Sequence, residues 1–147
     1  MNPTIRHTGI VVHDLRSCIN FWKDGMGFTV VKEMIESGHH IDKMMNLKDV
    51  VVTTVKMTND TNQLIELLHF SSHFNTPRWL GNTCSTGLTH IAFTVDEIDS
   101  ILIRFRELGY NNKSTPQLSP DGSVKVIYAE GPEGLILELV EILNPKS

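Results

Sequence analysis

Apolar and polar residues alternate along several short stretches of the chain, which is the pattern of strands with one buried face. Two such stretches, residues 8–12 and 91–95, are each followed by apolar positions at helical spacing, in residues 15–22 and 98–105. Six further stretches are also predicted to be strands, at residues 29–37, 49–58, 62–70, 115–119, 123–131 and 134–142.

An acidic residue stands at the start of each predicted helix, and a glycine stands near its end. Asp14 and Asp96 occupy positions from which a side chain can cap the first turn. Gly27 and Gly109 follow the last turns, where a glycine can take the left-handed conformation that closes a helix. Both segments therefore have the same order of strand, acidic turn, amphipathic helix and glycine.

This order of elements repeats along the chain, which indicates an internal duplication. The segment HTGIVVHDLRSCINFWKDGMGFTVV aligns with HIAFTVDEIDSILIRFRELGYNNK, and this places His7 on His90. The segment NQLIELLHF aligns with GLILELVEI, and this places Glu66 on Glu138. The sequence therefore predicts an α+β fold made of two βαβββ modules.

A length of 147 residues fits one compact domain, so both modules are expected inside it. Module 1 is predicted at about residues 4–70 and module 2 at about residues 88–143. A stretch rich in Ser, Thr, Asn, Pro and Gly, residues 71–87, is the predicted linker. Module 1 also carries an insert at residues 37–49 with one apolar side, interpreted either as a helix that caps a pocket or as one that completes the core or forms a dimer contact.

Composition narrows the classes of partner. The formal net charge of -4 comes without any run of Lys and Arg, so nucleic acid is not an expected partner. No apolar stretch approaches the length of a membrane span, and the N-terminus lacks the pattern of a signal peptide, so a cytoplasmic location is expected. The two cysteines, Cys18 and Cys84, do not indicate a disulfide framework.

Strand alternation predicts the direction in which the repeated His and Glu side chains point. If Ile10 and Val12 face the first helix, His7 lies on the opposite face of its sheet, and the same argument applies to His90. Glu66 stands in the apolar stretch LIELL and Glu138 in LILEL, so both carboxylates also point away from the helices. All four side chains are therefore expected on the face that no helix covers.

A carboxylate in the middle of an apolar strand is costly to desolvate unless a cation or a strong donor meets it. Two such carboxylates with two histidines in the repeat-related strands predict one shared cation. Imidazole nitrogen and carboxylate oxygen suit Ni, Co, Zn, Mn or Fe, and the ligand set does not separate these metals. The predicted ligands of one divalent ion are His7, Glu66, His90 and Glu138.

With these features the chain resembles the vicinal oxygen chelate superfamily, which includes glyoxalase I, methylmalonyl-CoA epimerase, extradiol dioxygenases and the fosfomycin and bleomycin resistance proteins. The resemblance covers nearly the whole chain, and HTGIVVHDLRSCINFW, GLTHIAFTVDEIDSILIRFRELGY and GPEGLILELVE carry it. It implies paired modules that form a cupped mixed sheet around a metal ion. It also implies a homodimer, with the metal site built within one chain or across two.

The resemblance implies a role for each predicted ligand. His7 and His90 match the histidines that open the modules, and Glu138 matches the glutamate of the closing strand. Glu66 matches a fourth position that glyoxalase I and the epimerases fill with Glu or Gln, whereas dioxygenases and fosfomycin-type enzymes generally use only two histidines and one glutamate. The set is therefore most similar to that of glyoxalase I.

The implied function is that of a metal-dependent lyase or isomerase of the glyoxalase I type, which moves a proton next to a carbonyl through a metal-stabilised enediolate or enolate. Glu138 is the first candidate for the base and Glu66 the second. The alternatives are an acyl-CoA epimerase similar to methylmalonyl-CoA epimerase, an extradiol-type dioxygenase and a non-catalytic drug-binding resistance protein. The expected partner is a small-molecule substrate.

Other polar residues are weaker candidates for the site. An epimerase needs a second acid-base group, and Glu33, Glu36 and Asp42 are alternatives between which the sequence does not choose. Three cations could bind an anionic substrate or simply be exposed, namely Arg6, Arg78 and Lys125.

Overall fold

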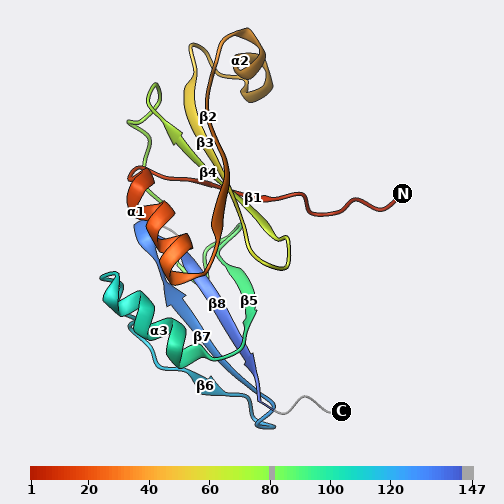
Figure 1. Ribbon diagram of the computed structural model, residues 1–147, viewed down its shortest axis with the longest axis vertical. Coiled ribbons are helices and arrows are strands. Elements are labelled where there is room, and N and C mark those ends of the chain that lie inside the picture. The colour runs from red at the N-terminus through yellow and green to blue at the C-terminus, as the bar shows by residue number, and fades with distance from the viewer. Residues whose placement is uncertain (80–81, 144–147) are drawn as a thin grey trace. The chain divides into compact units, whose positions relative to one another are not determined.

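The computed structural model describes residues 1–79 and 82–143, and the chain divides into two compact units (Figure 1). Unit 1 comprises Met1–Pro77 and unit 2 comprises Arg78–Ser147, so the boundary falls within the predicted linker, residues 71–87. Residues 80 and 81 of that linker lie outside the described residues. Each unit has its own four-stranded mixed sheet, which confirms the α+β class and the repeated module.

In unit 1 the strand order is β1-β4-β3-β2, where β1 and β4 are parallel and the other neighbours are antiparallel. Its elements are β1 (Thr8–Val11), α1 (Leu15–Asn20), the π-helical turn η1 (Phe21–Gly25), β2 (Thr29–Ser37), α2 (His39–Met45), β3 (Val51–Thr58) and β4 (Leu64–Phe70). The predicted βαβββ order is therefore present, with α2 as an addition.

Unit 2 repeats this topology with the strand order β5-β8-β7-β6, where β5 and β8 are parallel. Its elements are β5 (Ile91–Val95), α3 (Ile98–Glu107), β6 (Gln117–Leu118), β7 (Val124–Glu130), the 3-10 turn η2 (Pro132–Gly134) and β8 (Ile136–Ile142). No helix in the described ranges 1–79 and 82–143 has the length and hydropathy that a bilayer crossing demands.

Each sheet buries one face against its own helix. In unit 1, Ile65 and Leu67 of β4 are buried on the side of α1, whereas Glu66 between them points to the other face. In unit 2, Leu137 and Leu139 of β8 are buried on the side of α3 in the same way. The side chains of both closing strands therefore alternate in the predicted directions. Burial of the apolar side chains favours this arrangement, since it is the main favourable contribution to the stability of each unit.

The first helix ends in a wider turn than its apolar spacing predicts. The backbone N–H of Met26 donates to the carbonyl of Phe21 at 3.2 Å, a bond across five residues that is typical of a π turn. Two consecutive aromatic residues, Phe21 and Trp22, are both buried there, and Trp22 meets Phe28 edge to face at 5.2 Å. Gly27 then adopts the expected left-handed conformation with φ 75°.

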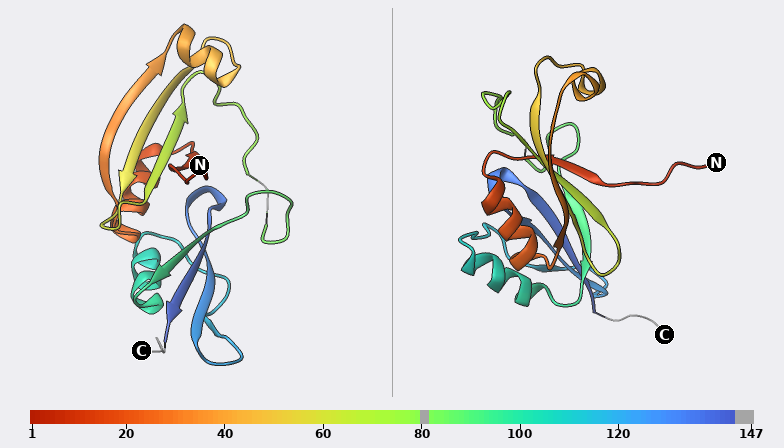
Figure 2. Two further views of the ribbon diagram at one scale, coloured as in Figure 1. Left: turned by 90° about the vertical axis from the view of Figure 1, so that its right-hand side faces the viewer. Right: turned by 45° about the horizontal axis from the view of Figure 1, so that its top comes forward.

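The insert at residues 37–49 contains α2, which lies at the end of the sheet where β2 ends and β3 begins (Figure 2). A small apolar cluster forms from Ile41, Val50 and Val52, with Met45, Leu68 and Phe70 packed against it. Leu68 is two residues from Glu66 on β4, so this cluster covers one end of the sheet face that carries Glu66. The insert therefore forms a short helix whose Ile41 is buried in this cluster.

The helices α1 and α3 begin with different caps. At α1 the backbone N–H of Ser17 donates to Oδ1 of Asp14 at 3.1 Å and its hydroxyl donates to Oδ2 at 2.8 Å, which confirms Asp14 as the cap. At α3 the expected cap Asp96 is wrong, because the N-cap residue is Glu97 and its side chain makes no capping bond. The first turn of α3 is capped from a strand instead, by Glu141 of β8.

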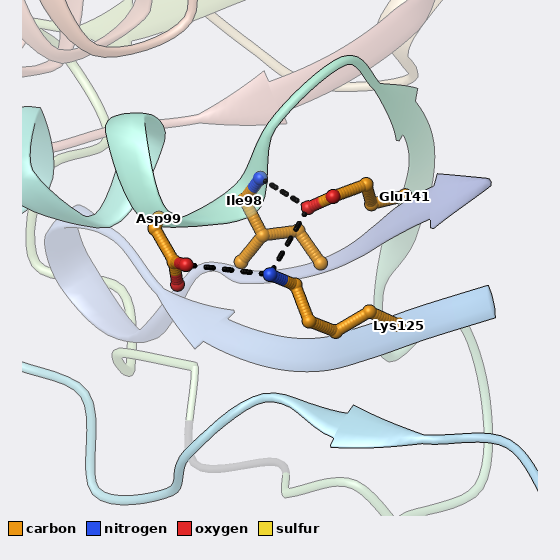
Figure 3. A network of polar contacts seen from close by, with 4 residues as sticks. All are labelled: Ile98, Asp99, Lys125 and Glu141. Carbon is orange, nitrogen blue, oxygen red and sulfur yellow. Dashed lines mark hydrogen bonds and ion pairs between the residues drawn. The ribbon is translucent and has the colours of Figure 1, made fainter. Parts of the chain in front are cut away.

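Glu141 joins α3 to β8 and β7 through a small polar network (Figure 3). Its Oε2 accepts from the backbone N–H of Ile98 at 2.9 Å and lies 3.3 Å from Nζ of Lys125, which lies 3.3 Å from Asp99 on the other side. Partial desolvation lowers the pKa of Lys125, but its hydrogen bonds to Asp99 and Glu141 and their charges outweigh this and raise the pKa above its usual value. Lys125 is therefore a structural cation on the helix-covered face.

We expect Glu141→Ala to destabilise the protein by about 1–2 kcal/mol, because the first turn of α3 loses its charged cap. Glu141→Gln is the matched control, since its amide oxygen can still accept from the N–H of Ile98 and should recover part of the loss. Urea unfolding monitored by circular dichroism measures the difference. An unchanged unfolding midpoint for Glu141→Ala would contradict the capping role.

Acid should remove the contribution of Asp14 to stability. Hydrogen bonds from the backbone and side chain of Ser17, together with the charge of His69, hold the pKa of Asp14 below its usual 3.8. A depressed pKa in the folded state means that the stabilisation is complete above pH 3.8 and is lost as the pH falls through the lower folded value.

Asp14→Ala should therefore lower the melting temperature at pH 7, and this effect should shrink as the pH falls well below 3.8. Asp14→Ser keeps a capping oxygen that does not titrate, so it should remain capped throughout the titration. Thermal unfolding of the three proteins across this pH range tests the effect. A difference between wild type and Asp14→Ala that stays constant with pH would show that the carboxylate contributes no charge-dependent stability.

Candidate metal centre

The same strand register brings a histidine beside a glutamate in each unit. In unit 1, β1 pairs in parallel with β4 so that Thr8 lies opposite Ile65. In unit 2, β5 pairs in parallel with β8 so that Ile91 lies opposite Leu137. In both units, therefore, the residue after the histidine faces the residue before the glutamate. The two predicted pairs are equivalent in their backbone setting.

In unit 1 the imidazole of His7 faces the carboxylate of Glu66. His7 Nε2 lies 3.8 Å from Glu66 Oε1, and the side chains are 30% and 16% exposed. The other ring nitrogen, Nδ1, is buried and has no hydrogen-bond partner in the described part of the chain. Nε2 is therefore the nitrogen available to a ligand on the open side of the sheet.

In unit 2 the imidazole of His90 faces the carboxylate of Glu138 in the same way. His90 Nε2 lies 3.8 Å from Glu138 Oε2, and the side chains are 30% and 26% exposed. The second ring nitrogen is held from behind, because His90 Nδ1 lies 2.9 Å from the hydroxyl of Thr89. Such a partner orients an imidazole that binds metal through the opposite nitrogen.

The separation of the two atoms in each pair fits shared ligation of one cation. At 3.8 Å the nitrogen and oxygen are too far apart for a good direct hydrogen bond. Metal bonds to imidazole nitrogen and carboxylate oxygen are each about 2.0–2.2 Å long, so the two bonds together measure about 4.2 Å. One ion can therefore bind both atoms when they are 3.8 Å apart. The residues of each half-site therefore fit two coordination positions of a divalent metal.

The neighbours of each glutamate across the sheet differ in size and charge. On one side lie small residues, since Gly9 is opposite Glu66 and Ala92 is opposite Glu138. A Cβ added at Gly9 would lie 3.6 Å from Leu68, which is an ordinary van der Waals contact. The backbone at Gly9 therefore does not require glycine, and the position is open because the side chain is absent. On the other side Lys56 lies opposite Glu66. The small neighbours leave both carboxylates accessible from the open face.

In unit 2 the position that corresponds to Lys56 is occupied by an aromatic residue. Tyr128 lies opposite Glu138, and its ring is 4.9 Å from the ring of His90 at a tilt of 40°. The tyrosine therefore packs against the histidine and limits its ring orientations. The two His–Glu pairs thus match in residue type but have different neighbours on the third strand.

The structure brings together His7 with Glu66 and His90 with Glu138. Among the residues that the structure describes, no group of three or more His, Cys, Asp or Glu side chains gathers into a complete metal centre. Each unit by itself therefore contributes one His–Glu pair, a candidate half-site.

The three candidates for a second acid-base group lie in different places in the structure. Glu33 lies opposite the buried Val55 and accepts from Arg16 of α1 at 2.8 Å, so it belongs to the helix-covered face. Asp42 accepts from the backbone N–H groups of Asp49 and Val50 and thereby closes the loop after α2. Glu36 lies opposite Val52, on the sheet face of unit 1 that carries Glu66, which we call the ligand-bearing face. Glu36 is therefore the one of the three acidic candidates on this face.

Two cations lie beside a β-bulge on the face of Glu66. The pairing of β2 with β3 passes from Val30 opposite Met57 to Lys32 opposite Lys56, with Val31 as the extra residue. Lys32 keeps the alternation of Met34 and Glu36, whereas Thr29 and Val30 are out of step with it. Sequence reasoning missed Lys32 and Lys56, although alternation marks Lys56, which stands between the buried Val55 and Met57.

Comparisons with known proteins agree with this architecture. A family model, described as the Glyoxalase/Bleomycin resistance protein/Dioxygenase superfamily, matches residues 4–139. No curated protein matches the chain.

Several solved structures have the same fold. A glyoxalase family protein from Bacillus cereus is 23% identical, with a TM-score of 0.86 and 97% of each chain covered. Glyoxalase I from Zea mays is 18% identical, with a TM-score of 0.63 over 92% of this chain and 43% of that chain. Glyoxalase I from Leishmania major, described as trypanothione-dependent, is 18% identical, with a TM-score of 0.61 over 95% of this chain and 87% of that chain.

At these identities the solved structures establish the fold, whereas the family model covers most of the sequence itself. The repeated βαβββ module and the His–Glu pair in each unit agree with that match. The chain therefore belongs to the glyoxalase/bleomycin resistance protein/dioxygenase superfamily.

Proposed function

We propose that His7, Glu66, His90 and Glu138 hold one divalent metal ion and that the protein catalyses proton transfer next to a carbonyl, as a lyase or isomerase of the glyoxalase I type. The observation that carries the proposal is the identical register of the two His–Glu pairs. A pair from unit 1 and a pair from unit 2 are required, whether they belong to one chain or to two copies in a homodimer.

The presence of Glu66 favours proton transfer over oxygen chemistry. Its carboxylate has the same setting as that of Glu138, with a histidine nitrogen at 3.8 Å in both units. Four protein ligands would leave room on a six-coordinate ion for a substrate that binds through two neighbouring oxygens. A dioxygenase needs a further position for oxygen, and Glu66 would occupy it.

The bound ion supplies Lewis-acid stabilisation of the negative charge that develops on the substrate oxygens. Glu138 is the first candidate to remove the proton from the adjacent carbon, because its side chain is more exposed than that of Glu66, at 26% against 16%. The same carboxylate returns the proton to the same or the neighbouring carbon. Thr89 and Tyr128 hold the ring of His90 during this exchange.

Metal titration tests the ligand set without any substrate. Glu66→Ala and Glu138→Ala should each weaken Ni²⁺ or Zn²⁺ binding by more than about 100-fold, because even partners of metal ligands contribute about 10- to 100-fold. Glu107→Ala is the control, since this exposed residue ends α3 and lies outside both pairs. Calorimetric affinities for one variant equal to wild type would remove that glutamate from the ligand set.

Proton exchange tests the reaction class. The metal-loaded protein should turn over the adduct of glutathione and methylglyoxal, and Glu138→Ala should lower kcat by about 10²- to 10⁴-fold, as expected for loss of a general base. Deuterium exchange from solvent into methylmalonyl-CoA instead would assign the epimerase alternative. The proposal is wrong if chelation changes neither activity nor melting temperature, or if protein purified from its native host holds no stoichiometric divalent ion.

A further inference from the structure

Two lysines face each other beside Glu66 on the ligand-bearing face of unit 1. Lys32 of β2 lies opposite Lys56 of β3, and Lys56 in turn lies opposite Glu66 of β4. Residues that are directly opposite in an antiparallel pair point to the same face, with Cβ atoms about 4.5–5.5 Å apart. The three side chains therefore form one row that leads from the edge strand to the metal half-site.

This lysine pair is costly in the free protein. Like charges that are directly opposite in a sheet repel each other. In the described part of the chain, the carboxylates within 4.0 Å of a Lys or Arg are paired with Arg16, Lys113 or Lys125, and the partner of Glu66 is His7. An anion beside the two ammonium groups would remove this repulsion.

The β-bulge at Val31 lies directly beside the lysine pair. Val31 is the extra residue and is exposed, and Lys32 after it shares a face with Met34 and Glu36. Bulges are frequent next to active sites, where they redirect a side chain.

In residues 82–143, which the structure describes, unit 2 shows no equivalent charge beside its His–Glu pair. Tyr128 takes the position of Lys56 and contacts His90 with its ring. The lysine of β7, Lys125, lies on the opposite face between Asp99 and Glu141. Within the described residues, the cationic row therefore belongs to one of the two copies of the module.

We propose that Lys32 and Lys56 form a subsite for a carboxylate group of the substrate, next to the metal-binding oxygens. This proposal rests on the proposed function, because the metal ion anchors the other end of the substrate. It narrows the substrate class to carbonyl compounds that carry a carboxylate a few bonds from the two oxygens that meet the ion.

A matched pair of metal-binding probes tests the subsite by binding rather than by turnover. The monohydroxamate of succinic acid and its primary amide have the same length and bind metals through the same two oxygens, but only the first carries a carboxylate. On nickel-loaded protein the carboxylate probe should bind about fivefold tighter or more, as expected of a charge-assisted contact at a half-exposed site. The advantage should shrink at high salt.

Lys56→Met and Lys32→Met should reduce the affinity ratio of the two probes to about one, and Lys56→Arg should retain most of it. Lys23→Met is the control, because Lys23 is an exposed lysine of η1 outside this row. Calorimetry gives the affinities, and circular dichroism verifies that each variant is folded.

Three outcomes overturn the proposal in different ways. If wild type binds both probes equally, the metal site stands and the carboxylate subsite does not exist. If Lys56→Met weakens both probes by the same factor, Lys56 acts only as the neighbour of Glu66 in the sheet. If neither probe binds the nickel-loaded protein, the two-oxygen metal site of the proposed function is wrong as well.

Discussion

The parallel register between the first and last strands of each unit is the constraint on which the rest of the structure depends. A slip of one residue between β1 and β4 would turn Glu66 into the apolar layer under α1, where an unpaired carboxylate is costly. Burial of Ile65 and Leu67 prevents that slip, and Leu137 and Leu139 do the same in unit 2. The apolar residues on one face thereby position the polar residues on the other. The candidate metal centre is a direct product of core packing.

Sequence alone predicted the features that follow from periodicity and repetition. The βαβββ order, the cap at Asp14, the left-handed Gly27 and Gly109 and the direction of the closing strands are all present in the structure. Some of these features depend only on neighbouring residues. The others occur in both modules, so the sequence of one module supports the prediction made for the other. The equivalence of the His–Glu pairs was accessible for the same reason, because each residue has a counterpart in the second module.

Features that depend on contacts between distant strands were not predictable in this way. The bulge at Val31 arises from the pairing of β2 with β3, and no residue in the stretch marks it. The cap of α3 comes from Glu141, whereas the sequence offered the adjacent Asp96 as the obvious candidate. The position of α2 over one end of the ligand-bearing face likewise depends on tertiary packing. The structural role of Lys125 was not predictable for the same reason, since it follows from the ion pairs with Asp99 and Glu141.

The two caps also make the modules differ in the order in which their parts can form. The bond that starts α1 joins residues three positions apart, so the helix can begin as soon as its own turn has been synthesised. The bond that starts α3 spans 43 residues and needs Glu141 of β8. The chain must therefore be synthesised through Glu141 before the first turn of α3 is secured. During synthesis, unit 1 can mature while the helix of unit 2 is still frayed at its first turn.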